Sequence, residues 1–292
     1  MNKIKYIDRK TNKIKTENPP GENYLKFLYN NPFGKIPLNL IIKRKITSKI
    51  YGRLMDKPKS KNKIKQFVKT YNINMTESLK PIKEFKTFNE FFYRKLKPES
   101  RHIQSGIISP ADGKLIAFEN IQNIKSFFIK GNKFTLEKFL QNKILANNYK
   151  TASLIIIRLA PNDYHRFHFP YKGKISKTTK INGKYYSVSP YAIKNNFTIF
   201  CENKREYSIL KTKTKGNILI SEIGATMVGK IIQTYKANQI VEKGQEKGYF
   251  AFGGSSLLIL IDNNKININK DILENTKKGF ETSIQMGESI EE

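Results

Sequence analysis

Residues 249–262 read Y-F-A-F-G-G-S-S-L-L-I-L-I-D. The branched apolar residues after the serines predict a buried β-strand, because strands inside a sheet are rich in such side chains. Two glycines and two serines precede that run, although glycine weakens a strand and an unpaired hydroxyl is costly in a dry interior. The segment 252–256 is therefore either a bend in the chain or the position of a reactive serine.

Short apolar segments fill the rest of the sequence after Arg101. They predict a strand-turn-strand unit at 107–118, a short helix at 134–140 and a buried strand at 152–159. Glycine and asparagine separate the further predicted strands, which cover 172–176, 197–201, 207–210, 217–222, 225–233 and 238–242. Short strands at this spacing are typical of an antiparallel sandwich or a barrel-like domain.

The sequence between about residues 23 and 95 has a helical pattern instead. Between residues 38 and 54 an apolar residue recurs at every fourth position and basic residues fall between, which predicts a basic amphipathic helix. Such a helix either packs on its own domain or lies in a membrane interface. Further helices are predicted at 62–73 and, with an N-terminal cap, at 87–97.

These segments together predict an α+β fold. The chain has 292 residues, of which 38% are hydrophobic, enough for a large packed domain with a smaller module. We predict an N-terminal region of amphipathic helices at 1–98. A mainly antiparallel β sandwich or barrel-like domain is predicted to follow at 99–292.

The charge of the chain favours a polyanionic partner. Its formal net charge is +30, and residues 1–100 carry 25 Lys and Arg against 8 Asp and Glu. A basic body attracts either nucleic acid or an anionic membrane surface. Compositional drift toward Lys, Asn and Ile is the alternative explanation. Because no sequence motif for reading nucleic acid is recognisable, we do not expect nucleic acid as a partner.

The sequence also bears on the compartment. Cys201 is the single cysteine, so the chain can form no internal disulfide. No run of about 18 apolar residues predicts a transmembrane helix, and the first residues lack the apolar stretch of a secretory signal. We therefore expect a protein that is made and kept in the cytosol, where it can lie on a membrane.

Three polar positions outside the serine segment are candidates for chemistry. His165 and His168 stand three residues apart, directly after a predicted buried strand. Loops at the ends of core strands often carry functional residues, although a single histidine is more often structural. Asp112 precedes a glycine in a predicted turn, where it either forms the turn or orients a histidine. No metal is expected, because no further His or Cys is suitably spaced to complete a metal site.

The serine segment fits neither of two common motifs. Leu257 stands where the nucleophile elbow G-x-S-x-G requires its last glycine, and the G-K-[ST] ending of a P-loop is missing. A glycine directly before a serine does allow the hydroxyl to attack the carbonyl of the preceding residue, because glycine adopts strained backbone geometry and presents no side chain. Ser255 with a histidine and an aspartate would supply a nucleophile, a base and an orienting group.

Three segments together resemble the phosphatidylserine decarboxylase family. They are S-P-A-D-G at 109–113, L-A-P-N-D-Y-H-R-F-H-F-P at 159–170 and F-G-G-S-S at 252–256. Similar segments are F-N-E-F-F-Y-R-K-L-K-P at 88–98, V-E-K-G-Q-E-K-G-Y-F at 241–250 and D-I-L-E-N-T-K-K-G-F-E-T at 271–282. The resemblance runs from about residue 25 to the end of the sequence, and the histidine segment is its most specific part.

The resemblance implies a proenzyme that cuts its own chain between Gly254 and Ser255. Ser255 would attack the Gly254 carbonyl to form an ester, and β-elimination would then break the chain and leave dehydroalanine. This residue would tautomerise to an imine, which water hydrolyses with loss of ammonia to leave a pyruvoyl group in place of the serine. The family pattern assigns the cleavage base to His168 and the orienting carboxylate to Asp112, a charge relay that acts on the enzyme's own backbone. His165 resembles the histidine that the family places beside the pyruvoyl group, for substrate positioning and protonation.

The resemblance also implies the cofactor and the partners. The covalent pyruvoyl group would condense with the amine of phosphatidylserine and accept the electrons released with CO2, giving phosphatidylethanolamine. A β chain of residues 1–254 and an α chain of residues 255–292 would remain together as a heterodimer, and a homodimer is left open. An anionic lipid substrate favours the membrane interpretation of residues 38–54. The resemblance therefore implies a membrane-docking region at 1–98 and a β-rich catalytic domain at 99–292. The protein would be peripheral, at the cytoplasmic face of the cell membrane.

One departure from the family pattern concerns the cleavage site. Many bacterial members carry Leu-Gly-Ser-Thr where this chain has residues 253–256 as Gly-Gly-Ser-Ser, but the Gly–Ser pair to be cut is the same. An alternative function is a Ser-His-Asp lipid hydrolase that keeps Ser255 and the chain intact. A basic nucleic-acid-binding protein is the rival from a different class.

Overall fold

The computed structural model describes residues 4–17, 50, 52–126, 134–195, 198–225 and 230–292. The strands are β1 Ile4–Asp8, β2 Lys13–Glu17, β3 Gly113–Phe118, β4 Ser153–Leu159, β5 Arg166–His168, β6 Gly173–Ile175, β7 Thr179–Ile181, β8 Arg205–Lys211, β9 Asn217–Gly224, β10 Ile231–Gln233, β11 Ile240–Val241, β12 Glu246–Phe250, β13 Ser255–Ile261 and β14 Glu281–Ile284. The α-helices are α4 Ile64–Tyr71, α5 Phe88–Phe92, α6 Leu136–Leu140, α7 Lys143–Asn148, α8 Pro190–Asn195, α9 Ile199–Glu202 and α10 Lys270–Lys277. Short 3-10 helices include η2 Pro58–Lys63, η3 Met75–Glu77 and η5 Pro98–Ser100.

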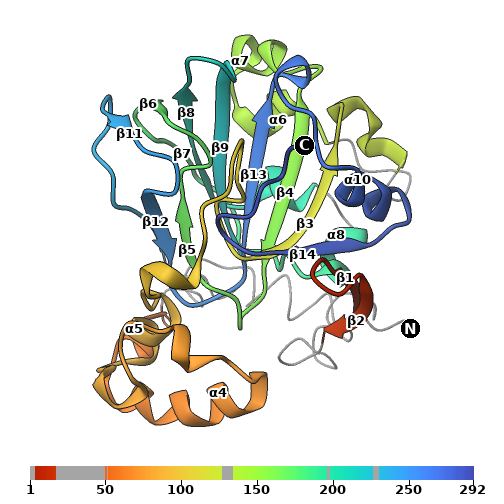
Figure 1. The fold of residues 1–292 in the computed structure, drawn as a ribbon. Coiled ribbons are helices and arrows are strands. Elements are labelled where there is room, and N and C mark those ends of the chain that lie inside the picture. Colours follow the sequence, from red (N-terminus) through yellow and green to blue (C-terminus); the bar gives the residue numbers. More distant parts are fainter. Residues whose placement is uncertain (1–3, 18–49, 51, 127–133, 196–197, 226–229) are drawn as a thin grey trace.

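Two sheets form the body of the molecule (Figure 1). The main sheet has the order β11-β6-β8-β9-β13-β4-β3-β14-β1-β2, with β7 also paired to β8, and the small sheet has the order β10-β12-β5. All pairings between these strands are antiparallel except that of β1 with β14. The predicted α+β class with a mainly antiparallel sheet is therefore confirmed.

Strand β13 lies near the middle of the main sheet, hydrogen-bonded to β4 on one side and β9 on the other. Leu257, Ile259 and Ile261 pack on the face covered by the small sheet and α10, whereas Leu258 and Leu260 pack on the face covered by helices α6 to α9. Because both faces are buried, the strand is apolar at every position after its serines rather than alternating.

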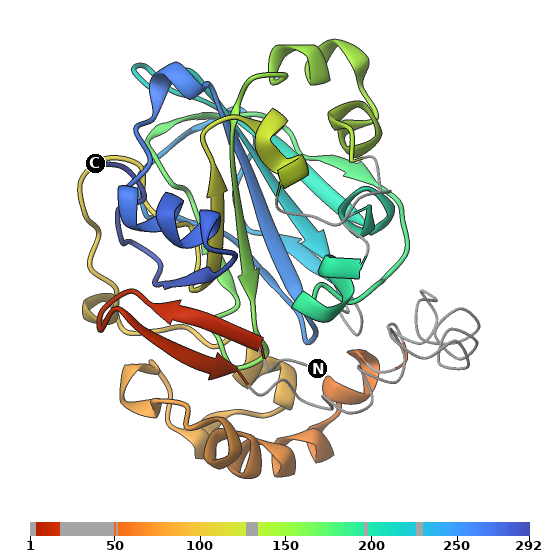
Figure 2. The same cartoon turned by 90° about the vertical axis from the view of Figure 1, so that its right-hand side faces the viewer.

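A separate aromatic cluster packs between the short helices of residues 52–92. Phe85, Phe88, Phe91 and Phe92 form its centre with residues of α4, and Phe252 packs against it. Thr87 caps α5, since its side chain accepts a hydrogen bond from the backbone N–H of Glu90, as the sequence predicts. In Figures 1 and 2 this orange region lies below the sheets. It therefore contacts the two-sheet body at the segment that precedes Ser255.

The structure corrects two expectations about the strands. The main sheet is open, with unpaired edges at β11 and β2, so the part of the chain that the structure describes contains no closed barrel. The predicted strand at 197–201 is wrong, because Ile199–Glu202 form helix α9. The Arg205 guanidinium donates to the Cys201 carbonyl of α9 and to the Lys138 and Phe139 carbonyls of α6. A short apolar run cannot distinguish a strand from a buried helix by its own pattern, and this link to α6 decides between them.

The beginning of the chain differs from the sequence prediction too. Residues 4–17 form the hairpin β1–β2, which extends the main sheet beside β14. Asp8 stabilises the turn by accepting hydrogen bonds from the backbone N–H and hydroxyl of Thr11. Residues 38–49 of the predicted basic helix lie outside the described residues, and the division at residue 98 stays a prediction. Within the described residues, no helix combines the length and apolar character needed to cross a bilayer.

Candidate active site

Ser255 is the first residue of β13 and is completely buried. The two residues before it are glycines, and Gly253 has φ 139°, a backbone conformation that residues with a side chain rarely adopt. The preceding turn is fixed by Asn89, whose side-chain oxygen accepts a 2.9 Å hydrogen bond from the Phe252 N–H. The serine hydroxyl therefore lies in a dry interior, behind a strained and well-anchored segment.

His165 is the histidine that contacts this hydroxyl. Its Nδ1 lies 3.4 Å from Ser255 Oγ, and its Nε2 lies 3.1 Å from the carbonyl oxygen of Ala160. A carbonyl oxygen only accepts hydrogen bonds, so the neutral ring carries its proton on Nε2 and leaves Nδ1 free to accept from the serine. Phe92 stacks on the imidazole with 3.9 Å between ring centroids.

The electrostatic surroundings keep His165 neutral. Burial lowers its pKa to about 3, and the positive charges of Arg94 and Lys114 act in the same direction. The backbone loop that carries it is held by Asp163, whose Oδ2 accepts a 2.7 Å hydrogen bond from the Ala160 N–H. Lys114 donates to the same carboxylate at 2.8 Å. A neutral imidazole at a fixed position is suited to hydrogen bonding rather than to holding a proton as a cation.

His168 is the last residue of β5 and has different neighbours. Burial lowers its pKa to about 4, but the carboxylates of Glu246 and Asp112 act in the opposite direction. Its Nδ1 is buried and has no hydrogen-bond partner among the described residues. An imidazolium is therefore easier to form here than at His165. The structure shows no direct hydrogen bond from His168 to Ser255.

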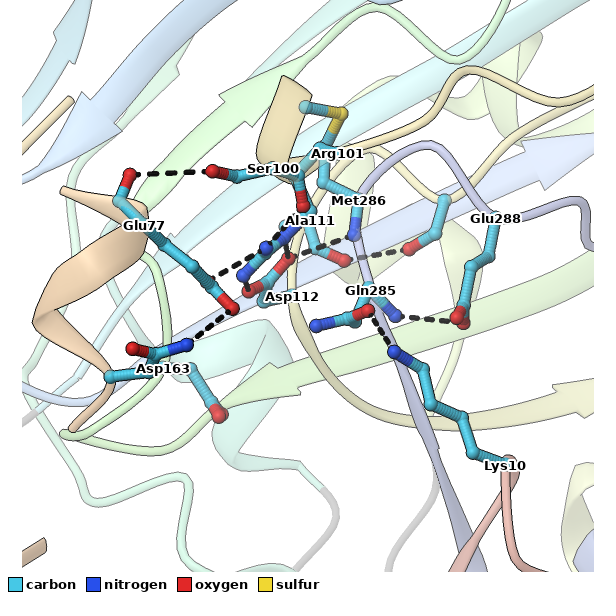
Figure 3. Close-up of polar contacts among 12 residues, drawn as sticks. Lys10, Glu77, Ser100, Arg101, Ala111, Asp112, Asp163, Gln285, Met286 and Glu288 are labelled. Carbon is cyan, nitrogen blue, oxygen red and sulfur yellow. Dashed lines mark hydrogen bonds and ion pairs between the residues drawn. The ribbon is translucent and has the colours of Figure 1, made fainter. Parts of the chain in front are cut away.

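Asp112 is held by groups other than the predicted histidine (Figure 3). Its Oδ1 accepts hydrogen bonds from Arg101 Nε at 2.9 Å and from the Met286 N–H at 2.8 Å, and its Oδ2 is paired with the same guanidinium. Glu77 binds another nitrogen of Arg101 at 2.9 Å. Asp112 thus acts on His168 through its charge, without the direct hydrogen bond that a charge relay requires.

The structure therefore places two of the predicted residues in direct contact and gives the other two no hydrogen bond to them. Ser255 and His165 are in contact, while Asp112 and His168 lie in one electrostatic neighbourhood beside them. Sequence reasoning on single residues missed Asn89, Phe92, Arg94 and Arg101. The first three belong to the segment 88–98, which resembled the family, so that segment was the signal that could have found them. Within the described ranges, His, Cys, Asp and Glu side chains form no group that could hold a metal ion.

Comparison with known proteins identifies the family. The family model described as phosphatidylserine decarboxylase matches residues 88–292, which include Asp112, both histidines and the Gly254–Ser255 pair. The chain belongs to the phosphatidylserine decarboxylase family. Its members are carboxy-lyases, so the expectation of an enzyme of this class is confirmed.

Curated relatives extend the match beyond residue 88. A protein of Fusobacterium nucleatum named phosphatidylserine decarboxylase proenzyme is 57% identical over 291 residues, which are 99% of this chain and 97% of that protein. Proteins of the same name from Clostridium tetani and Clostridium novyi are 49% and 46% identical over 290 residues, with 98% of this chain covered in both cases and 97% and 98% of those proteins. This phosphatidylserine decarboxylase family member is therefore similar to them over almost its whole length.

Proposed function

We propose that this chain is a proenzyme that cuts itself between Gly254 and Ser255 and then decarboxylates phosphatidylserine to phosphatidylethanolamine. Family membership supports the reaction, since the relatives are named for it. The observation that carries the self-cleavage is the position of Ser255: its buried hydroxyl follows a glycine pair in strained backbone and lies 3.4 Å from an imidazole nitrogen. Such an arrangement suits attack of the hydroxyl on the preceding carbonyl.

The cleavage step needs a base that can hold the serine proton. We assign this role to His168 with Asp112 as its supporting carboxylate, because Glu246 and Asp112 offset part of the lowering of its pKa by burial. His165 faces the cations Arg94 and Lys114 and is the poorer base. Transfer from Ser255 to His168 then requires a bridging water or a shift of the ring, since the two side chains are not hydrogen-bonded. The predicted charge relay is retained as a proposal in this form.

The residues around Ser255 fit a pyruvoyl group formed at that position. Such a group supplies an electron-accepting carbonyl that takes up the electron pair released as CO2 leaves. His165 lies against the same position with Nδ1 unprotonated, so it would orient the substrate by accepting a hydrogen bond from its amine. To return a proton to the α-carbon, Nδ1 must first take one up from the substrate ammonium. Stacked Phe92 and the aromatic cluster exclude water from this side. Strand β13, bound to both β4 and β9, would hold residues 255–292 in place after the cut.

We also propose that the N-terminal helices bring the enzyme to the cytoplasmic face of an anionic membrane. Residues 52–55, at the end of the predicted basic helix, are helical in the structure. Ile50 and Leu54, four positions apart, are 53% and 44% exposed, which suits shallow insertion of one helical face. Liposome co-sedimentation tests this after replacing five basic residues with Gln. They are Lys43, Arg44, Lys45, Lys49 and Arg53.

The membrane test has a matched control with the same loss of charge. Five exposed lysines of the β-rich domain would be replaced by Gln instead: Lys143, Lys150, Lys174, Lys177 and Lys180. We expect the first set to release the protein from anionic vesicles and the second to leave most of it bound. Equal binding of both variants would return the 38–54 segment to a purely structural role.

The central test is the mass of the purified protein. The wild-type chain should separate under denaturing conditions into residues 1–254 and 255–292, with a blocked N-terminus on the smaller piece. Ser255→Ala should stay whole and inactive, because no hydroxyl remains to attack Gly254. Ser256→Ala is the matched control, since that hydroxyl has no hydrogen-bond partner among the described residues and successive strand residues point to opposite faces. An intact wild-type chain with esterase activity would instead establish the hydrolase.

A further inference from the structure

Arg94 has a buried guanidinium for which the described residues supply no hydrogen bond or ion pair. Its side chain lies just beyond α5 and the residue is 7% exposed. Its guanidinium carbon lies 5.2 Å from the ring centre of Phe91, and its Nε has no hydrogen-bond partner among the described residues. No ion pair of this side chain is seen in the same part of the chain. Burying a charge in this way is unfavourable unless a partner arrives.

The other buried arginines show that the fold normally satisfies such groups. Arg158 is paired with Glu17 and Glu281, and Arg166 is paired with Glu246. The remaining one, Arg205, donates to four backbone carbonyl groups, those of Lys138, Phe139, Cys201 and Asn203. Arg94 is thus the exception among the buried arginines described, and its donors are available to an anion.

Arg94 also lies beside the reacting position. Its positive charge is close enough to lower the pKa of His165, the ring that contacts Ser255. Phe92, two residues earlier, stacks on that same ring. The carboxylate that acts most strongly on Arg94 is Asp112, but both oxygens of Asp112 are already bound to Arg101. Among the described residues, Arg94 Nε is therefore left without a partner beside the ring that contacts Ser255.

We propose that Arg94 binds the phosphodiester of the phospholipid headgroup while the serine amine reacts at position 255. This inference rests on the proposed function. The headgroup carries two anions, a phosphodiester and the carboxylate that leaves as CO2. A cation on the carboxylate would stabilise the substrate more than the transition state, in which that charge is disappearing. The phosphodiester keeps its charge throughout, and guanidinium groups bind phosphate oxygens in a bidentate manner.

The product distinguishes the two anions, because phosphatidylethanolamine retains the phosphodiester and lacks the carboxylate. The experiment uses the processed enzyme in mixed micelles, after a gel confirms that Arg94→Gln is cleaved. We expect Arg94→Gln to raise the KM for phosphatidylserine and the inhibition constant for phosphatidylethanolamine by the same factor, about 10- to 100-fold. The kcat should change much less, and Arg94→Lys should recover part of the binding. Lys95→Gln, an exposed neighbour with the same charge, is the control.

Two results would overturn the proposal. A raised KM with unchanged product inhibition would assign Arg94 to the carboxylate, and unchanged values for both would remove it from headgroup binding. If Arg94→Gln is not cleaved, the comparison moves to the uncleavable Ser255→Ala chain, with glycerophosphoethanolamine as the probe. Glycerophosphoethanolamine should raise the melting temperature of Ser255→Ala and leave that of Ser255→Ala/Arg94→Gln unchanged. Equal shifts in the two chains, or no shift in either, would reject the assignment. A wild-type chain that is never cut would reject the proposed function separately.

Discussion

The two buried histidines predict a loss of stability in mild acid. Burial lowers the pKa of His165 to about 3 and that of His168 to about 4, from 6.5 in an unfolded chain. Because both folded values are lower, the unfolded chain binds more protons between pH 6.5 and these values. The stabilising contribution is therefore complete above pH 6.5 and is lost as the pH falls toward 4.

The magnitude follows from these values. Between pH 7 and pH 4.5 each histidine should lower the free energy of unfolding by about 2.5 kcal/mol, or about 5 kcal/mol together. The assay is urea unfolding followed by circular dichroism at the two pH values, in the Ser255→Ala background so that the chain stays in one piece. Carboxylates such as Asp8 also contribute to the acid sensitivity, so the histidine part is isolated by comparison with His165→Asn/His168→Asn in the same background.

We expect the double variant to lose about 5 kcal/mol less than its parent between pH 7 and pH 4.5. His102→Asn is the matched control, because that side chain is exposed and its replacement should leave the pH dependence of the parent. If the double variant and its parent respond equally to acid, the burial of the two imidazoles does not control their protonation, and the assignment of His165 as a permanently neutral group is wrong.

Three further predictions concern the site and its support. His165→Ala should still be cleaved, but its rate of decarboxylation, measured as CO2 release, should fall by about 100-fold or more. The reason is that the ring lies at the reacting position and is a poor base. An uncut chain would assign the cleavage role to His165. Gly253→Ala should slow cleavage, followed by gel after synthesis, because φ 139° costs about 1–3 kcal/mol for a residue with a side chain; an unchanged rate would show that the turn relaxes freely. Lys247→Met should lower the free energy of unfolding by about 3–5 kcal/mol, because it leaves Glu222 buried without its cation. Lys247→Met/Glu222→Leu should recover most of that loss. If the losses of the two single variants simply add in the double variant, Lys247 and Glu222 are not energetically coupled.

Much of the fold could be predicted from local patterns. The apolar run 257–261 predicted a buried strand, and the prediction succeeds because both faces of β13 are buried in the structure. The helix that begins after Thr87 was predicted from its capping residue. The hairpin at residues 4–17 was missed, because its strands are short and largely polar and it is held by pairing with β14. Helix α9 was mistaken for a strand, since the contacts that fix it come from Arg205.

The chemical groups of this protein can be read from short motifs: the Gly254–Ser255 pair, His165, His168 and Asp112 are recognisable because such motifs preserve residue types at fixed spacing. Which of these groups meet depends on the tertiary structure. His165 and His168 are three residues apart, yet the turn into β5 directs one to Ser255 and the other toward the carboxylates of Asp112 and Glu246. Arg94 and Arg101, both close in sequence, differ in the same way, since only Arg101 reaches a carboxylate. Partners, burial and local charge depend on chain segments far apart in sequence, and these set the pKa and the role of each group.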